Sequence, residues 1–338
     1  MDFERGSLFT RSSYLDPLEH CGCASPAAGW TPAHVETAAG RAPAYLKMHS
    51  WGEFVFDFAL ARAYEQHGLR YYPKLVCSVP FTPVPGPRLL AADHTGRRKL
   101  ADALIGRARE RKCSGAHVLF CTKDEADLLA DAGWLTRVQP RYLWRNGGYA
   151  DFETFLSTLN SKQRKNIRRE RRGIVESGLD IRWQSAEELD ARDWPQLFRL
   201  YASTYAMRGQ DAYLNLDCLR QWGENFPRAL RFCIARDRGE PVAMAFFFEE
   251  GDALYGRHWG ASVQLSGLHF ELCYYRGIEW CIERGLQLFD AGVQGEHKLA
   301  RGFAEELAHS AHWFAHDALR APIRAWFEQE RRALAAVS

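Results

Sequence analysis

YGRHWGASVQLSGLHFELCYYRGIEWCIERGLQLFDAGVQGEHKLARGF, residues 255–303, is the stretch of sequence that decides the fold predicted for this chain. It opens with a strand, continues with a helix over about 268–284, and returns to a short strand at 286–290. Histidines, carboxylates, tyrosines, a lysine and an arginine gather where these elements begin and end. The ends of elements can be reached from water, whereas the middle of a packed helix cannot. We therefore expect a functional site at these junctions.

The composition is that of a globular protein with room for two domains. The chain has 338 residues, of which 46% are hydrophobic and 25% are charged. The formal net charge of +2 is nearly balanced, which excludes a global field that would draw the protein to nucleic acid or membrane. No P-loop, dinucleotide-binding fingerprint or Ser-His-Asp nucleophile elbow is present.

Cysteine and histidine usage bears on compartment and metal content. The nine cysteines include no CxxC pair, and Cys21 and Cys23 flank a single glycine, too close for an ordinary disulfide. Free thiols in a reducing compartment fit this pattern. The first residues lack the apolar core of a secretion signal, and no apolar run is long enough to span a bilayer, so we expect a cytoplasmic protein. His309, His312 and His316 fall on both faces of a predicted strand, so no metal site is expected.

Alternating and helical patterns divide the rest of the chain into short elements. In the first half they predict strands at 44–48, 117–121 and 141–145 and helices at 59–67, 96–111 and 123–131, with the proline-rich segment 79–90 as an ordered loop or edge segment. In the second half Asp151 is predicted to cap a helix and Gly178 to end the next one. Strands at 230–236, 242–248 and 253–259 form a meander, and the chain closes with a loop-helix at 292–300 and a strand at 310–314.

The two halves of the chain share a faint internal similarity. HVLFCTKDEADLLADAGW (117–134) and LQLFDAGVQGEHKLARGF (286–303) each contain a strand, a short helix and a glycine followed by an aromatic residue. The interval from Phe120 to Gly133 equals that from Phe289 to Gly302. This indicates a duplication, with predicted domains at 1–148 and 149–338, the second including a basic helix at 161–172.

The order of elements in the second half resembles a GNAT acyltransferase domain, and two such domains in tandem resemble the FemABX aminoacyl-transferases. Seven runs carry a closer resemblance to the bacterial FemAB-like family of peptidoglycan biosynthesis or recognition: KMHSWGEFVFD (47–57), YYPKL (71–75), VPFTPVPGPRLL (79–90), SKQRKNIRRER (161–171), YGRHWG (255–260), LHFELCYY (268–275) and GEHKLARGF (295–303). The resemblance covers nearly the whole chain. It implies an α/β (α+β) fold of tandem GNAT-like domains, with mixed central sheets flanked by helices, and an acyltransferase activity.

Two departures from the family pattern concern the acceptor side of the expected site. Between His34 and Tyr45 the chain is shorter than its relatives, as if a hairpin were trimmed from the first domain. After Phe303 it reads Ala304 and two glutamates where relatives tend to carry a proline. Neither departure alters the predicted fold.

The run GEHKLARGF is the first candidate for catalysis. It lies in a loop entering a helix, where backbone amides and a cation can meet a negative oxygen. The resemblance implies that Lys298 lies beside the transferring carbonyl with Arg301 in support, and that neighbouring residues contact substrate. The alternative is that Glu296 and Lys298 are surface residues of a short helix. The predicted substrate contacts here are Gln294, Glu296 and His297.

His258, His269 and Glu271 are candidate proton acceptors. They stand at the end of a strand and the start of the next helix, a junction that the resemblance places beside the acyl donor. An amine nucleophile must lose a proton, and any of the three could take it. Tyr274 and Tyr275 either line the cleft or pack in the core. Substrate contacts are also predicted for Arg257, Trp259 and Tyr275.

Two polar groupings lie outside this stretch. The first-half motif is dense in charge among aromatics, and it either binds the acceptor or forms a paired network at the domain interface. The basic run 161–172 is either a solvated helix or a site for an anionic partner, such as a tRNA acceptor arm, a nucleotide-linked precursor or a CoA diphosphate. The first grouping comprises Lys47, His49, Glu53, Asp57, Tyr72, Lys74 and Arg88, and the second Lys162, Arg164, Lys165, Arg168 and Arg169.

The glycine-rich Q/R-x-x-G-x-G/A loop that grips CoA in ordinary GNATs is missing before the helix at 268, where residues 261–267 offer one glycine. We therefore predict transfer of an activated acyl or aminoacyl group to an amine, such as that of a cell-wall precursor or peptide, with aminoacyl-tRNA as donor. Acyl-CoA is the alternative donor, and a non-catalytic module binding cell-wall precursors or RNA is the alternative function. No tightly bound cofactor is expected.

Overall fold

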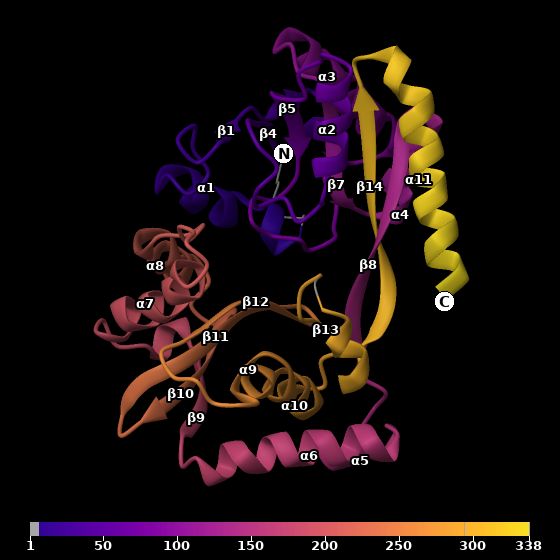
Figure 1. The fold of residues 1–338 in the computed structure, drawn as a ribbon. Helices are drawn as coiled ribbons and strands as arrows, with labels where there is room; N and C mark the ends of the chain where they lie inside the picture. The colour runs from indigo at the N-terminus through magenta and orange to yellow at the C-terminus, as the bar shows by residue number, and fades with distance from the viewer. Residues whose placement is uncertain (1–6, 294, 338) are drawn as a thin grey trace. The chain divides into compact units, whose positions relative to one another are not determined.

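The computed structural model describes residues 7–293 and 295–337 (Figure 1). The chain forms two compact units, unit 1 from Met1–Pro140 with Leu307–Ser338 and unit 2 from Arg141–Glu306. This division differs from the predicted domains 1–148 and 149–338, because the last segment of the chain belongs to the first unit. The physical reason lies in the strand pairing described below.

Unit 1 is a mixed sheet covered by helices. Its strands follow the order β1-β4-β5-β7-β14, with β5 and β7 parallel and β7 and β14 antiparallel. A small second sheet has the order β2-β3-β6. The elements are η2 (Leu8–Thr10), α1 (Ser12–His20), β1 (Trp30–Pro32), β2 (Val35–Thr37), β3 (Gly40–Ala42), β4 (Ala44–Lys47), α2 (Phe58–Gln66), β5 (Lys74–Cys77), β6 (Leu90–Ala91), α3 (His94–Glu110), β7 (Gly115–Cys121), α4 (Lys123–Asp131), the first part of β8 (Leu135–Arg145), most of β14 (Ala304–Phe314) and α11 (Asp317–Val337).

The core of unit 1 forms around β7, which is buried at every position. Leu100, Leu104 and Ala108 recur at helical spacing on α3 and pack in this core. The next helix, α4, begins with a capping box between Thr122 and Glu125, which satisfies backbone N–H groups that the helix leaves open. The predicted bounds of α4 agree with the structure.

Unit 2 has a mixed sheet in the order β8-β13-β12-β11-β10-β9. The strands β10, β11 and β12 form the predicted antiparallel meander, and β13 lies parallel to β12. The elements that belong to it are the end of β8, α5 (Phe152–Ser157), α6 (Ser161–Glu176), β9 (Asp180–Ser185), η3 (Ala186–Glu188), α7 (Asp193–Ala206), α8 (Leu216–Asn225), β10 (Leu230–Asp237), β11 (Glu240–Glu250), β12 (Ala253–Ala261), α9 (Leu268–Phe270), η4 (Glu271–Tyr275), α10 (Arg276–Arg284), β13 (Leu288–Asp290), η5 (Glu296–Arg301) and the start of β14.

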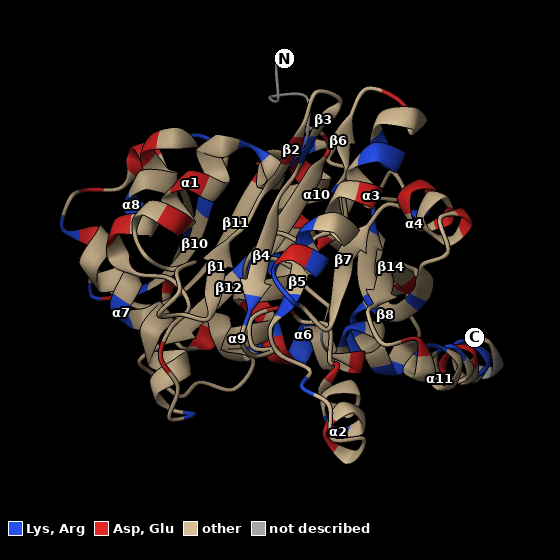
Figure 2. Cartoon of the chain, turned by 90° about the horizontal axis from the view of Figure 1, so that it is seen from above, with Lys and Arg blue, Asp and Glu red and all other residues tan. Residues whose placement is uncertain are grey.

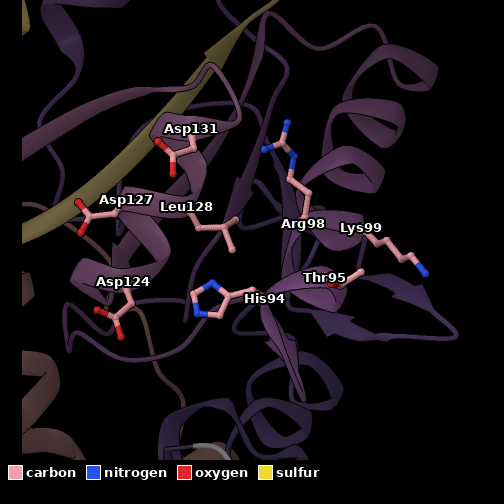
Figure 3. A pocket seen from close by; sticks show the side chains of 8 residues that line it. All are labelled: His94, Thr95, Arg98, Lys99, Asp124, Asp127, Leu128 and Asp131. Carbon is pink, nitrogen blue, oxygen red and sulfur yellow. The ribbon is translucent and has the colours of Figure 1, made fainter.

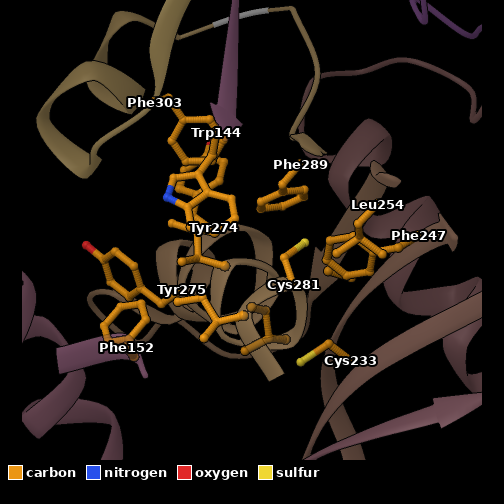
Figure 4. Close-up of a cluster of buried hydrophobic side chains, with 14 of the residues drawn as sticks. Trp144, Phe152, Cys233, Phe247, Leu254, Tyr274, Tyr275, Cys281, Phe289 and Phe303 are labelled. Atoms are coloured by element: carbon orange, nitrogen blue, oxygen red, sulfur yellow. The ribbon is translucent and has the colours of Figure 1, made fainter. Parts of the chain in front are cut away.

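Both faces of the unit 2 sheet are covered, which explains its continuous apolar runs. On one face Cys233 and Phe247 pack against Leu272 and Cys281 of the η4–α10 segment, the cluster seen in Figure 4. On the other face aromatic side chains of β10 and β11 meet rings from α7 and α8. The ring pairs on this second face are Trp194–Phe232, Tyr201–Phe246 and Trp222–Phe248.

The predicted internal similarity has a structural counterpart in each unit. In unit 1 the strand β7 contains Phe120, and Gly133 follows α4 with a φ of +83°. In unit 2 the strand β13 contains Phe289, and Gly302 follows η5 with a φ of +82°. The prediction of an α/β fold with a mixed sheet flanked by helices is confirmed.

An exchange of strands corrects the predicted domain boundary. The chain leaves α4 of unit 1 through β8, whose residues Leu143–Arg145 pair with β13 of unit 2. It leaves η5 of unit 2 through β14, whose residues His309–Phe314 pair with β7 of unit 1. The strand β8, which follows α4 in the chain, therefore pairs within the sheet of unit 2. The strand β14, which follows η5, pairs within the sheet of unit 1.

The helices carry charged residues, and none of those described could span a membrane. Figure 2 shows acidic and basic residues interspersed on α3 and α11. No helix in the described part of the chain is long and apolar enough to cross a membrane.

Gly260 should be essential to the packing of unit 2. A Cβ there would lie 1.8 Å from the backbone oxygen of Leu200 on α7, an impossible approach. We expect Gly260→Ala to lower the free energy of unfolding by about 3 kcal/mol in urea denaturation. Gly173→Ala, on the exposed side of α6 with nothing near its Cβ, should raise it by about 1 kcal/mol. Equal midpoints for Gly260→Ala and the unaltered protein would contradict this account.

Candidate functional site

A cavity of about 130 Å³ opens in unit 2 where β12 and β13 separate. The two strands pair only from Ala253 to Tyr255, after which β12 continues to Ala261 while β13 ends at Asp290. The space left between them is closed by β11 on one side and by the helical segment after β12 on the other. The cavity is lined by Ala245, Phe246, Phe247, Gly256, Arg257, His258, Trp259, His269, Cys273, Tyr274 and Ala291.

A β-bulge in β12 turns side chains toward this cavity. Phe246 pairs with His258 and Phe247 with Gly256, so Arg257 is an extra residue in the ladder. Such a bulge bends a strand and redirects its side chains. Beyond it, the carbonyl oxygen of Trp259 accepts a hydrogen bond at 2.9 Å from a hydroxyl of α7. The backbone at the end of β12 is thus held by a helix instead of a neighbouring strand on that side.

The helix after β12 contains a π-helical turn at η4, Glu271–Tyr275, between α9 and α10. π-turns shift the register of a helix by one residue and are frequent at functional sites. Here the turn directs Cys273 and Tyr274 to the cavity, while Tyr275 is buried on another side of the helix. The prediction left open whether the two tyrosines line a cleft or pack in the core. Both are buried in the core of unit 2, and Tyr274 also lines the cavity.

The two candidate histidines line the cavity as neutral rings. Burial, with the nearby Arg257, lowers the pKa of His258 well below its ordinary value. Burial, with the nearby cations of the η5 loop, lowers the pKa of His269 to about 4. The ring of His269 stands edge-on to Trp259 with centroids 4.9 Å apart, and His258 Nδ1 lies 3.3 Å from the hydroxyl of Tyr205.

Lys298 is buried beside the cavity, with 1% of its surface exposed. Its ammonium donates a hydrogen bond to the carbonyl of Gly292 and lies 5.8 Å from the ring centroid of Tyr274. Burial lowers the pKa of Lys298 to about 8, although Asp290 partly offsets this. Asp290 is itself fixed by Arg141 at 2.7 Å. A cation held this way can act on a reacting group without being free in water.

Arg301 is also buried, and it connects η5 to the basic helix. Its guanidinium donates to the two carboxylate oxygens of Glu170 at 3.1 and 3.2 Å and to the hydroxyl of Tyr275 at 2.9 Å. It stacks 3.5 Å from the ring centroid of Phe270. Arg301 therefore fixes the η5 loop against α6 and η4, and its charge is already paired.

Glu271 is engaged in a separate ion-pair network on the side of α6. Both of its oxygens accept from Arg171 at 3.1 Å, and Arg276 lies 3.0 Å away. Arg171 also binds Glu279 at 2.9 Å. With both oxygens held by guanidinium groups, Glu271 is suited to positioning the helix, and it is not among the residues that line the cavity.

In unit 1 the structure gathers part of the first-half motif into a buried ion network. Lys74 donates to Glu53 at 2.7 Å, to Ser50 at 3.0 Å and to Asp57. Burial raises the pKa of Glu53 to about 7. This grouping matches the alternative of a paired network, because the charges largely satisfy one another.

Of the other residues of that motif, three lie around the ion network and one lies outside it. Lys47 lies 3.8 Å from the ring centroid of Trp30, and burial lowers its pKa to about 7. The hydroxyl of Tyr72 bonds Ser50 at 2.8 Å, and His49 lies 3.5 Å from Lys47. Arg88 is not part of the group, because its guanidinium donates to the carbonyls of its own loop and of β7. Those carbonyls belong to Val84, Pro87 and Leu119.

The basic helix α6 divides its cations between two faces. Arg164 donates to the carbonyl of Leu159, and Arg168 pairs with Glu153 at 2.6 Å. The exposed side carries four cations at spacings of three and four residues, which place them in one stripe about 15 Å long. They make no ion pair with another described residue, and they are Lys162, Lys165, Arg169 and Arg172.

A larger hollow lies between α3 and α4 of unit 1, with a volume of about 710 Å³ (Figure 3). His94, Arg98 and Lys99 line one side, and Asp124 and Asp127 the other. Apart from Leu128, the lining side chains are exposed, so this is a surface groove of solvated charges. We place the candidate site at the smaller cavity, where buried polar groups converge.

The remaining predicted residues lie at the rim or outside the described chain. Glu296 and His297 are exposed, and His297 Nε2 lies 2.9 Å from the hydroxyl of Tyr274. Gln294 lies outside the described residues. Glu170, Asp290 and Cys273 carry no role in the predictions from sequence. Glu170 was visible as the only acid of the basic run, a signal for an inward-facing partner. No cluster of metal-binding side chains occurs among the residues described.

Comparison with solved structures places this arrangement in a known fold. FemX has 10% sequence identity and a TM-score of 0.53, with 94% of each chain covered. L-PGS from Bacillus licheniformis has 10% identity and a TM-score of 0.55, with 95% of this chain and 97% of that chain covered. No curated protein matches the sequence.

At the level of sequence, the model of the FemAB-like family, described as peptidoglycan biosynthesis/recognition, matches residues 3–338. The chain belongs to the FemAB-like family.

His269 should titrate far below an ordinary histidine. We expect its ring to lose its proton at about pH 4 in an NMR titration of the folded protein, against about 6.5 in urea. Between these values the unfolded chain binds more protons, so stability should fall as the pH drops from 6.5 toward 4. His269→Gln should remove part of that pH dependence. A ring that titrates near 6.5 in the folded state would contradict the buried placement.

Proposed function

We propose that the protein transfers an activated acyl or aminoacyl group to an amine acceptor, with the reacting carbonyl at the mouth of the cavity between β12 and β13. The observation that carries the proposal is the buried ammonium of Lys298 next to that cavity. A preorganised cation stabilises negative charge that develops during the reaction more than charge already present before it. The family description makes a peptidoglycan precursor or peptide the favoured acceptor.

In the proposed reaction the amine nitrogen attacks the carbonyl carbon, and the carbonyl π electrons move to oxygen. In this step Lys298 donates to the oxyanion, and Arg301 keeps the η5 loop in place through Glu170. The adduct then collapses, the bond from carbon to the carrier's oxygen or sulfur breaks, and the leaving group takes a proton. Alignment of the two substrates supplies the rest of the acceleration.

The proton released by the amine must be accepted near the carbonyl. Of the three predicted candidates, His258 and His269 line the cavity, whereas Glu271 is held by arginines. The low pKa of His269 means that it accepts a proton readily only from a strong acid. The ammonium of the tetrahedral adduct is a stronger acid than the protonated free amine, so proton transfer follows the attack.

The exposed stripe on α6 supports a donor whose carrier is rich in phosphate. Its four cations lie on the face of α6 opposite Ile167 and Ile174, which are buried. Like charges at helical spacing repel each other, and a polyanion relieves that repulsion. A charged tRNA has the extended phosphate backbone that such a stripe fits.

Acyl-CoA is the second candidate donor, and one observation favours it. The described lining of the cavity contains no aspartate or glutamate to pair with the ammonium of an aminoacyl group. A CoA thioester carries an acyl group without that charge, and its diphosphate can use some of the same cations. Thermal shifts with CoA and with charged tRNA distinguish the two, because a bound ligand raises the melting temperature.

Replacement of Lys298 tests the transfer chemistry. We expect Lys298→Met to reduce kcat/KM about 100- to 1,000-fold, measured with labelled acyl donors and precursor peptides that bear a free amine. Its stability should not fall, because methionine fills the same volume without a buried charge. Leu299→Ala, at an exposed position of the same turn, is the matched control and should retain activity. Full activity in Lys298→Met, or binding without product in the unaltered protein, would refute the proposal.

Neutralising the stripe tests the carrier. The quadruple variant Lys162→Gln, Lys165→Gln, Arg169→Gln and Arg172→Gln should bind charged tRNA more weakly and with a shallower dependence on salt. The slope of log K against log salt should change by about 0.9 for each phosphate that the variant no longer neutralises. A control that removes four exposed cations of unit 1, Arg62, Lys99, Arg111 and Arg332, should leave that slope unchanged. An equal weakening of binding in the two variants would assign the effect to net charge alone.

A further inference from the structure

The cavity in unit 2 has a definite size. Its volume of about 130 Å³ is close to that of an engineered cavity of about 150 Å³ that admits benzene. It is well below the roughly 300 Å³ or more of pockets that hold drug-sized ligands. Part of this space must also admit the bond that links acyl group and carrier. The cavity therefore has room for an acyl group of a few carbon atoms.

Small residues create that space. Gly256 of β12, Ala245 of β11, Ala291 after β13 and Cys273 of η4 line the cavity between the larger rings. A Cβ on Gly256 would lie 3.4 Å from Phe247 and 3.5 Å from Ala291, so it would contact both without a clash. A methyl group at this position would occupy space that an acyl chain could otherwise use.

Two basic side chains lie at the cavity, and one of them, Lys298, is buried. Arg257 lines it and Lys298 lies beside it, while the two histidines of the lining are neutral. Asp290, the last residue of β13, is buried and bonded to Arg141 at 2.7 Å and to the backbone of Gly292 at 2.9 Å. The lining in the described residues includes no carboxylate. A second cation placed here would be desolvated with no partner.

This arrangement bears on the choice between acyl groups. In an aminoacyl group the ammonium is attached to the carbon next to the carbonyl. It cannot be kept away from a carbonyl that lies near Lys298, and the two positive charges repel each other. Acyl groups that are neutral or negatively charged are not repelled in this way.

We propose that this cavity selects a small acyl group that carries no positive charge, with Gly256 and Ala291 setting the size limit and the buried cation Lys298 excluding a free α-ammonium. This inference rests on the proposed function, since it places the transferred group in the cavity. It narrows the donor to simple acyl groups or to aminoacyl groups whose amine is blocked.

Minimal thioesters of N-acetylcysteamine test the selection without either carrier. Propionyl and glycyl thioesters are nearly isosteric and differ by the ammonium, and an octanoyl thioester tests size. We expect kcat/KM for propionyl to exceed that for glycyl by about 100-fold or more and that for octanoyl by about 10-fold or more. Non-transferable ketone analogues of the same three compounds give the binding preference by calorimetry, independent of turnover.

Two variants test the assigned residues. Gly256→Ala should lower binding of the octanoyl and propionyl analogues, the larger one more, because one methyl group is worth about 10-fold or more in a closed site. Ala291→Asp adds a carboxylate at the cavity and should shift the preference toward the glycyl analogue by about 10-fold or more. Val263→Asp, which adds the same charge on the loop beyond β12, is the control and should shift nothing.

The outcomes separate this inference from the proposed function. Analogue binding with the expected order but no turnover of any thioester would support the cavity's selectivity and refute the transfer reaction. Turnover with equal or better use of the glycyl thioester would refute the selectivity and leave the transfer reaction intact. Failure of all three analogues to bind, or equal shifts in Ala291→Asp and Val263→Asp, would overturn the assignment of the acyl group to this cavity.

Discussion

The separation of β12 from β13 is the constraint on which the rest of unit 2 depends. The strand β13 pairs with β12 over all of its residues, opposite Ala253–Tyr255, and then ends while β12 continues to Ala261. The bulge at Arg257 and the π-turn of η4 both lie at the resulting opening and direct side chains into it. Because β13 is so short, the chain after it must fold back as the η5 loop. That loop buries Lys298, whose charge would otherwise have remained in water.

Ion pairs hold this loop in place from the outside. The helix α6 presents Glu170 to Arg301 and Arg171 to Glu271, so one face of a basic helix fixes both η5 and η4. Its two buried isoleucines supply the apolar contact. The helix α6 thus forms ion pairs on its inner face and carries a row of cations on its outer face. Neighbouring charged residues of α6 therefore differ in role: Arg169 is exposed, whereas Glu170 and Arg171 form ion pairs with η5 and η4.

Local patterns in the sequence were sufficient for the elements that pack regularly. The capped helix α4, the meander of β10–β12 and the junction around Lys298 follow from turn residues, alternation and resemblance. The partners of Glu170 and Glu271 could not be predicted, because those pairs join segments far apart in the chain. The π-turn was not visible either, since a register shift of one residue within a short helix does not stand out from the apolar spacing around it. The predicted boundary at residue 148 missed the strand exchange because pairing partners of β8 and β14 are not encoded locally.

The exchange of β8 and β14 also dictates an order of assembly during synthesis. Unit 2 receives its borrowed strand β8 before its own meander is made, so it has every strand it needs once β13 emerges. Unit 1 lacks the neighbour of β7 until β14 is translated, nearly two hundred residues later. Domains usually fold from the N-terminus onward as the ribosome proceeds. In this chain the earlier-made half must wait with an open sheet edge, which makes it the part that needs protection from aggregation in the nascent polypeptide.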